Sequence, residues 1–90
     1  MNRVDAFLEL AVNQGGSDLH LVSGQPPRIR IQGELEPVRF RELSVGDVND
    51  FLNEFLGPEQ REAVATHGAL DLAYESPTAG RFRVNVYRHL

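Results

Sequence analysis

The sequence lacks cysteine, and because its nine basic residues are all arginine it lacks lysine as well. Without cysteine there are no disulfides, no thiolate nucleophiles and no zinc–thiolate sites. Without lysine these residues offer no Schiff-base amine, no lysine general base and no phosphate-binding P-loop lysine. Arginine carries a rigid fork of donors that matches phosphate oxygens. The two absences therefore exclude several enzyme classes and leave arginine as the only permanently charged cation.

Long apolar runs and a surplus of positive charge are also missing. No apolar stretch approaches the ~20 residues that span a bilayer, and the N-terminus lacks the basic-then-apolar pattern of a signal peptide. The net charge of −4 argues against broad adhesion to nucleic acid or anionic lipid. At 90 residues, with 41% hydrophobic and 24% charged residues, the composition is that of a small globular domain. We expect a single cytoplasmic domain over residues 1–90, with no nucleic acid as partner.

Charge is unevenly distributed along the chain. Residues 1–41 carry five acidic residues and five arginines, whereas residues 42–75 carry eight acidic residues and one arginine. Residues 76–90 carry three arginines and no acidic residue. The sequence therefore has an acidic middle and a basic last segment.

Apolar periodicity predicts three helices. In residues 4–13 apolar side chains recur at helical spacing, and the glycines that follow end the helix. A second helix begins after Ser44, whose hydroxyl can cap free backbone donors while Asp47 sits at the positive helix end. A third begins at Pro58, a residue favoured in the first helical turn, and ends at Gly68.

Alternation of apolar and polar residues predicts five strands, in residues 17–22, 28–32, 35–40, 70–75 and 81–89. The second and third strands are joined by a tight reversal at Gln32 and Gly33. Pro37 confines the third strand to a sheet edge or a bulge. Because neighbouring strands are joined by short turns, we predict an α+β fold with a single antiparallel sheet and helices on one face.

Two strands each place two arginines on one face: Arg28 with Arg30, and Arg81 with Arg83. If these strands lie near each other, up to four guanidinium groups converge and form a polyanion site. The alternative is that they are ordinary exposed strand arginines, paired across the last hairpin with Asp71 and Glu75. Spacing alone leaves both interpretations open.

Catalytic constellations are not evident in the sequence. The three histidines, His20, His67 and His89, lie on three separate elements without metal-ligand spacing. His20 shares a strand face with Asp18, which favours a solvent-facing pair over a site. No serine occupies a nucleophile-elbow context, and the glycine pair before Ser17 precedes a strand rather than the helix start that cradles phosphate.

Four sequence blocks, in order and spanning essentially the whole chain, resemble one family. They are GSDLHL at 16–21, GQPPRIRIQG at 24–33, DLAYE at 71–75 and RFRVN at 81–85. These are similar to the (A/G)-S-D-L-H-L, G-x-P-P-x-x-R-x-x-G, D-x-x-(F/Y)-x and R-F-R-V-N blocks of the N-terminal domain of type IV pilus retraction and type II secretion ATPases. Among these ATPases the chain looks most like the PilT-like retraction motors of twitching motility.

The resemblance implies a PAS-like domain of a cytoplasmic homohexamer that works with the pilus machinery at the inner face of the inner membrane. In that family ATP, with Mg, lies between this domain and RecA-like C-terminal ATPase domains of its own and neighbouring subunits. By this resemblance, Arg83 is the first candidate for contact with the nucleotide phosphates, followed by Arg81 and then Arg30. The sequence ends before any Walker motif, so we expect an excised N-terminal piece with no catalytic residues of its own and no ATP hydrolysis alone.

Two other classes of function remain open at this point. A free-standing PAS-like sensor of a small ligand would need an enclosed apolar pocket in the core. An arginine-faced polyanion-binding module would use the same strand arginines, but the net charge of −4 counts against it.

Overall fold

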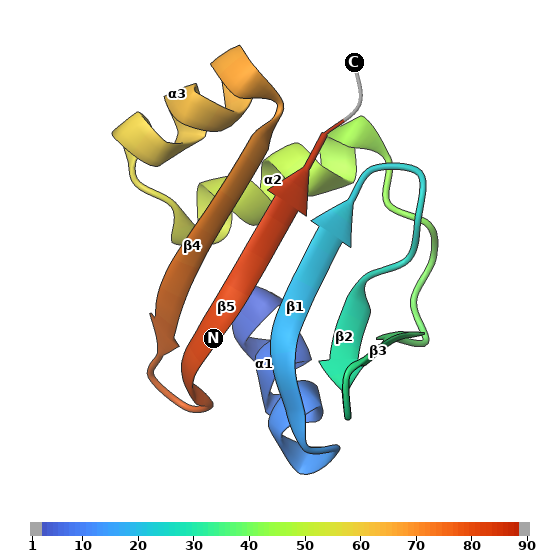
Figure 1. Ribbon diagram of the computed structural model, residues 1–90. Coiled ribbons are helices and arrows are strands. Elements are labelled where there is room, and N and C mark those ends of the chain that lie inside the picture. The colour runs from blue at the N-terminus through green and yellow to red at the C-terminus, as the bar shows by residue number, and fades with distance from the viewer. Residues whose placement is uncertain (1–2, 89–90) are drawn as a thin grey trace.

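The computed structural model describes residues 3–88 (Figure 1). Its elements, in chain order, are α1 (Arg3–Asn13), β1 (Gly16–Val22), β2 (Arg28–Ile31), β3 (Glu34–Pro37), α2 (Val45–Phe55), α3 (Pro58–His67), β4 (Ala69–Ser76) and β5 (Gly80–Tyr87). The predicted order of three helices and five strands is confirmed. The predicted end of the last strand at His89 lies outside the described residues.

The five strands form one sheet in the order β3-β2-β1-β5-β4. Neighbouring strands are antiparallel except for β1 and β5, which run parallel in the centre of the sheet. A single α+β sheet is therefore confirmed, but the prediction that every pair is antiparallel is wrong for this pair. The hairpin with β4 fixes the direction of β5, and β5 then fills the position beside β1, from which it is separated by most of the chain.

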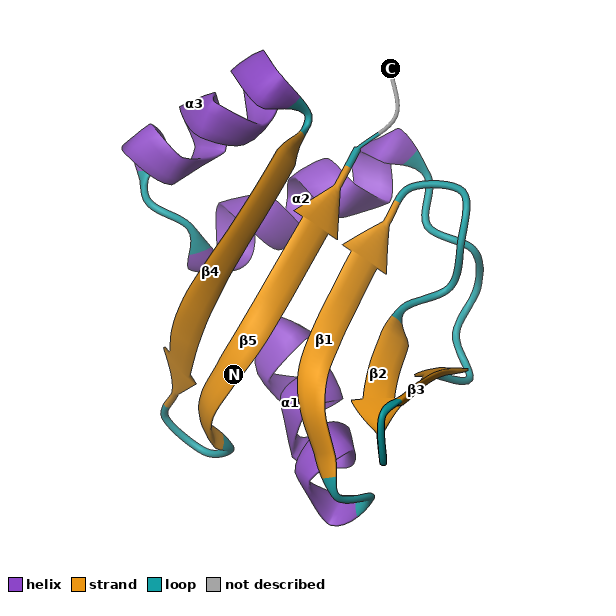
Figure 2. Ribbon diagram, viewed as in Figure 1, coloured by secondary structure: helices purple, strands orange, loops and turns teal. Residues whose placement is uncertain are grey.

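Helices α1 and α2 cover one face of the sheet, behind the strands in the view of Figure 2, and α3 packs near the start of β4. The alternating apolar residues of the central strands point toward these helices and are buried there, as predicted for Phe82, Val84 and Val86. Between the sheet and the helices, Phe7 meets Phe51 edge to face with ring centroids 5.6 Å apart. No helix among residues 3–88 is long and apolar enough to cross a membrane.

The third strand is shorter than the sequence predicts. β3 is an edge strand, as Pro37 requires, and it ends at that proline. Phe40 follows in an irregular segment, where its ring packs edge to face on Phe7 with centroids 5.3 Å apart. The turn before β3 has positive φ at both Gln32 (50°) and Gly33 (83°), which is the conformation of a tight two-residue hairpin.

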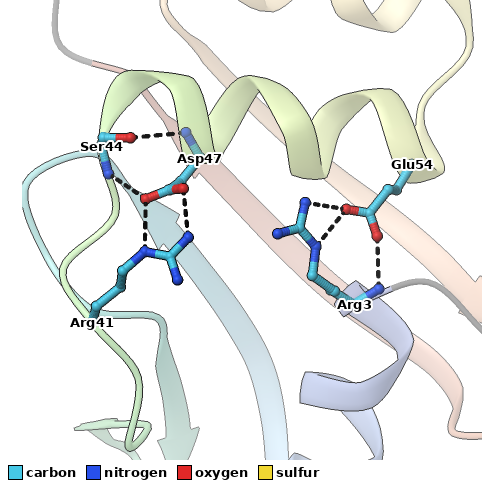
Figure 3. A network of polar contacts seen from close by, with 5 residues as sticks. All are labelled: Arg3, Arg41, Ser44, Asp47 and Glu54. Atoms are coloured by element: carbon cyan, nitrogen blue, oxygen red, sulfur yellow. Dashed lines mark hydrogen bonds and ion pairs between the residues drawn. The ribbon is translucent and has the colours of Figure 1, made fainter.

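Polar contacts fix the two covering helices to each other and to the loop before α2 (Figure 3). Ser44 and Asp47 form a capping box, and Arg41 donates to the Asp47 carboxylate at 2.8 Å. The hydrogen bonds from Arg41 and from the Ser44 backbone lower the pKa of Asp47 to about 2. At the other end of α2, the Nε of Arg3 donates to Glu54 at 2.8 Å. The predicted capping arrangement at Ser44 is confirmed.

A buried carboxylate joins α1 to β4. Asp5 is only 5% exposed, and its Oδ1 accepts hydrogen bonds from Tyr74 Oη at 3.0 Å and Ser76 Oγ at 2.7 Å. The Ser76 oxygen in turn accepts from the backbone of Ala79 in the β4–β5 turn. This network ties the first helix to the hairpin that carries two of the candidate arginines.

Candidate functional site on the open face of the sheet

The face of the sheet opposite α1 and α2, here called the open face, is turned toward the viewer in Figure 1. By the alternation of side chains along the strands, this face is lined by the polar residues that alternate with the core. Strand register places Arg30 of β2 and Arg83 of β5 on either side of Asp18 of β1. One pleat further along, His20 of β1 lies between Arg28 and Asn85. The parallel β1–β5 pairing is thus what brings the two arginine-bearing strands to a common centre.

Arg83, the first candidate for phosphate contact, is paired with an acidic residue. Its Nη2 and Nε donate to the two Asp71 carboxylate oxygens at 2.9 and 3.3 Å. This hydrogen-bonded pair raises the pKa of Arg83 and lowers that of Asp71. Because the side chains remain 63% and 52% exposed, a ligand can reach them, and the pair contributes little to stability.

Arg30 and Arg81 differ in how they are held. Arg30 Nη1 donates to the Gly33 carbonyl at 3.0 Å, and its Nε lies 3.9 Å from the Asp18 carboxylate. Arg81 stands opposite Glu75 in the strand register, near the β4–β5 turn, and is exposed. Within residues 3–88, the Arg81 side chain takes part in no hydrogen bond or ion pair, although its backbone belongs to the β4–β5 ladder.

The structure therefore combines the two interpretations that the sequence left open. Arg28, Arg30, Arg81 and Arg83 lie on one sheet face, but acidic residues stand between them, and the predicted cross-hairpin pairing is realised for Arg83 and Asp71. Arg30 and Arg83 are the two cross-strand neighbours of Asp18, whereas Arg81 stands apart at the hairpin end. An incoming phosphate would replace carboxylate partners with its own oxygens, for which guanidinium groups are equally well shaped.

His20 is a residue of this face to which the sequence analysis assigned no functional role. It shares the face with Asp18, as predicted, but it is half-buried rather than fully exposed to solvent. Its Nε2 atom is buried and has no hydrogen-bond partner among the described residues. Burial of the ring, followed by the positive charge of Arg30, lowers the pKa of His20. Its position inside the GSDLHL block was the available sequence signal.

A shallow hollow of about 390 Å³ adjoins the imidazole on the side of β5 and β4. Its lining includes His20, Asp71, Asn85 and Tyr87 together with the apolar Val22 and Ala69. No cluster of three potential metal-ligating side chains occurs in the part of the chain that the structure describes. The open face therefore offers donors for anions, and no metal ligands are assigned to it.

The chain is similar in sequence and in fold to known proteins. No protein-family model matches the chain. The chain is 31% identical over 84 residues to the type IV pilus retraction ATPase PilT of Pseudomonas aeruginosa, an alignment that covers 93% of this chain and 24% of PilT. A crystal structure of the pilus retraction motor PilT with bound ADP superposes with a TM-score of 0.74 at 27% identity, over 97% of this chain and 25% of that one.

This chain is homologous to the N-terminal region of PilT-like ATPases. The ATPase DotB of Legionella pneumophila agrees, with a TM-score of 0.72 at 30% identity over 92% of this chain and 23% of that chain. The chain spans about a quarter of the length of these relatives. The resemblance inferred from the four sequence blocks is thereby confirmed, while phosphate contact by Arg83, Arg81 or Arg30 stays a prediction.

Proposed function

We propose that the chain is the nucleotide-contacting and subunit-packing N-terminal domain of a hexameric type IV pilus retraction ATPase that acts in twitching motility. Homology to PilT along 93% of the chain supports the assignment to such a motor. The observation that carries the nucleotide contact is the open face, where Arg30 and Arg83 flank the Asp18 carboxylate from opposite sides of β1. Such paired guanidinium groups can stabilise the charge that develops on transferred phosphates.

Within this proposal, ATP lies between the open face and RecA-like C-terminal ATPase domains of its own and neighbouring subunits. Those domains supply the Walker lysine, which this chain lacks, and the ligands of Mg²⁺. The isolated chain therefore has no ATP turnover and at most weak nucleotide affinity. The assembled motor belongs at the cytoplasmic face of the inner membrane, together with the pilus machinery.

Arg83 is the first candidate for the phosphate contact because it sits on a central strand and is accessible. A strand aims a guanidinium more reproducibly than a loop does, and the exposed pairing with Asp71 can be exchanged at little cost. Arg81 and Arg30 are the second and third candidates. Among the residues that the structure describes, the Arg81 side chain has no hydrogen-bond or ion-pair partner, whereas Arg30 is anchored to the Gly33 carbonyl and is less free to reorient.

The test is Arg83→Ala in the complete ATPase that carries this domain, with steady-state ATP hydrolysis and thermal melting measured on the same sample. Arginine fingers contribute on the order of 10³–10⁵ in rate at the strong end, so turnover should fall steeply while the hexamer and its melting temperature persist. Arg83→Lys should rescue poorly, because an ammonium cannot make the two-pronged contact.

Arg61→Ala is the matched control, since this arginine lies on α3 and donates to Asn53 away from the open face. It should leave turnover unchanged. Near-normal turnover of a well-folded Arg83→Ala hexamer would remove Arg83 from the mechanism. Lost assembly with normal turnover in the remaining hexamers would assign it a structural role instead.

A further inference from the structure

The two edge strands of the sheet differ in how far they are protected against pairing with another chain. β3 has four residues and ends at Pro37, which has no N–H donor. β4 has eight residues and no proline, and it pairs with β5 without a register shift from Ala69 to Ser76. Natural proteins usually shorten, bend or interrupt exposed edges, because unpaired backbone groups recruit further strands. The β3 edge is protected in this way, and the β4 edge is not.

The outer side of β4 is accessible along its second half. Figure 1 shows β4 at the border of the sheet, with α3 near its first residue and no other ribbon of residues 3–88 along the outer side of its lower half. In an antiparallel ladder, alternate residues of an edge strand direct their N–H and C=O groups away from the paired strand. An extended chain at the usual strand spacing of ~4.8 Å can therefore add to the sheet here.

Charge on the open face changes sign from each strand to the next between β2 and β4. The charged side chains are, in sheet order, Arg28 and Arg30 of β2, Asp18 of β1, Arg81 and Arg83 of β5, and Asp71 and Glu75 of β4. Opposite charges on neighbouring strands favour pairing, and like charges oppose it. The Glu75 carboxylate is exposed and forms no ion pair within residues 3–88. A strand added outside β4 meets these carboxylates first, so a basic strand continues the alternation.

A second copy of this chain does not supply such a strand. Its two basic strands, β2 and β5, both lie inside the sheet. Its edges are β3, which carries Glu34 and Glu36, and β4, which would set its own Asp71 and Glu75 against the same two carboxylates. Neither edge offers a cation, so the occupant is a different polypeptide.

The helix side of β4 adds an apolar requirement. Leu70, Leu72 and Tyr74 alternate with the carboxylates and are only partly buried. Phe55 of α2 packs on Tyr74 with ring centroids 5.4 Å apart. A strand laid along β4 covers more of this apolar surface if every second side chain is apolar. On the open face, Asp71 and Glu75 are four residues apart, so they match two cations at the same separation.

We propose that the edge of β4 binds an extended segment of a partner protein by strand addition, and that this segment alternates apolar residues with polar ones that include two cations four residues apart. Main-chain hydrogen bonds supply the attachment, and the alternating side chains select the partner. This inference goes beyond the nucleotide contact proposed above and does not depend on it, because the bound strand lies outside β4.

The probe is the peptide acetyl-RVTVRVT-amide, titrated into the ¹⁵N-labelled 90-residue chain and followed by NMR. Shifts should saturate and be largest in β4, and outward-facing β4 amides should gain protection from hydrogen exchange. The amides of β3 should not gain protection, although that strand is also an edge. The peptide acetyl-EVTVEVT-amide has the same apolar pattern with the opposite charge and should not bind.

Two changes separate charge from strand pairing. Glu75→Arg should weaken RVTVRVT binding several-fold, whereas Glu36→Arg, the same charge change on the β3 edge, should not. N-methylation of the peptide amides that face β4 leaves its charge intact but removes hydrogen-bond donors, and it should abolish binding.

Four results would overturn the proposal. They are saturating shifts without protection of β4, equal affinity for a folded Glu75→Arg chain, equal affinity for EVTVEVT, and binding that survives N-methylation at every alternate set of amides. Dimers of the peptide-free chain with protected β4 amides would also contradict it, because they would make a second copy the occupant.

Discussion

The two faces of the sheet are built from the same strands but are held by different forces. On the helix-covered face, Leu19 and Val84 of the sheet and Phe51 of α2, which packs on it, are fully buried. On the open face, Arg30, Arg83 and Asp71 are held only by ion pairs and hydrogen bonds that water can reach. Burial is worth kilocalories per side chain, whereas exposed ion pairs are worth little. The covered face therefore stabilises the domain, and the open face can change partners without unfolding it.

The largest expected effect lies on the covered face. Phe51→Ala removes a fully buried ring that contacts Phe7, so the free energy of unfolding should fall by about 3–5 kcal/mol. Urea unfolding of the isolated chain measures this change. Arg81→Ala on the open face is the comparison and should leave the midpoint where it is. Equal destabilisation by the two variants would mean that the faces do not differ as described.

Asp5 adds to this comparison, because it is a buried polar side chain on the covered side of the sheet. Asp5→Ala leaves the Ser76 and Tyr74 hydroxyls without their acceptor and should cost about 1–3 kcal/mol of unfolding free energy. A double-mutant cycle with Ser76→Ala should be non-additive, because both residues share one network. Additive losses would show that the hydrogen bond contributes nothing of its own.

The α2 cap gives a smaller effect. Ser44→Ala removes the side chain that accepts from the Asp47 backbone, and loss of such a cap costs about 1 kcal/mol of unfolding free energy. Thermal melting of the variant beside Val45→Ala, an exposed neighbour, separates loss of the cap from a general effect of substitution.

The contribution of this cap to the stability of the chain depends on pH. The pKa of Asp47 is about 2 in the folded chain against an ordinary value of 3.8. Because the folded pKa is the lower one, the contribution of the carboxylate is complete above the ordinary value and disappears as pH falls toward 2. Melting curves should therefore show Asp47→Asn less stable than the parent at pH 6, with the gap closing between about pH 4 and pH 2. A gap that is constant with pH would contradict the lowered pKa.

The smallest effect is expected for the exposed ion pair of the open face. Asp71→Asn should leave the melting temperature of the chain unchanged within error, because both partners are already largely hydrated. A clear loss of stability would mean that Arg83 is a structural residue, unable to leave Asp71 for a ligand.

Much of the fold was predictable because it depends on local patterns. Alternation along β1 and β5 identified the buried residues, and the spacing of Ser44 and Asp47 identified the α2 cap. The parallel β1–β5 pairing was missed because it joins segments far apart in the chain, and no turn between them fixes their direction. Asp5 was missed for the same reason, since its partners are 69 and 71 residues away.

The candidate site was predictable only as a set of residues. Alternation placed Arg28, Arg30, Arg81 and Arg83 on strand faces, but their mutual positions depend on the strand order. The sequence could not decide which arginine pairs with an acidic residue, because Arg83 bonds diagonally to Asp71 rather than to its direct register neighbour, Ala73. Nor does a local pattern show that the His20 ring is half-buried and that its Nε2 atom has no hydrogen-bond partner within residues 3–88.

A structure of the assembled ATPase with bound nucleotide is the most direct test of whether the open face contacts the nucleotide. The prediction is that a phosphate oxygen lies within about 3 Å of the Arg83 guanidinium, over the open face, with the contact to Asp71 lengthened or broken. A nucleotide whose phosphates are held without Arg83, Arg81 or Arg30, with Arg83 still bonded to Asp71, would contradict it.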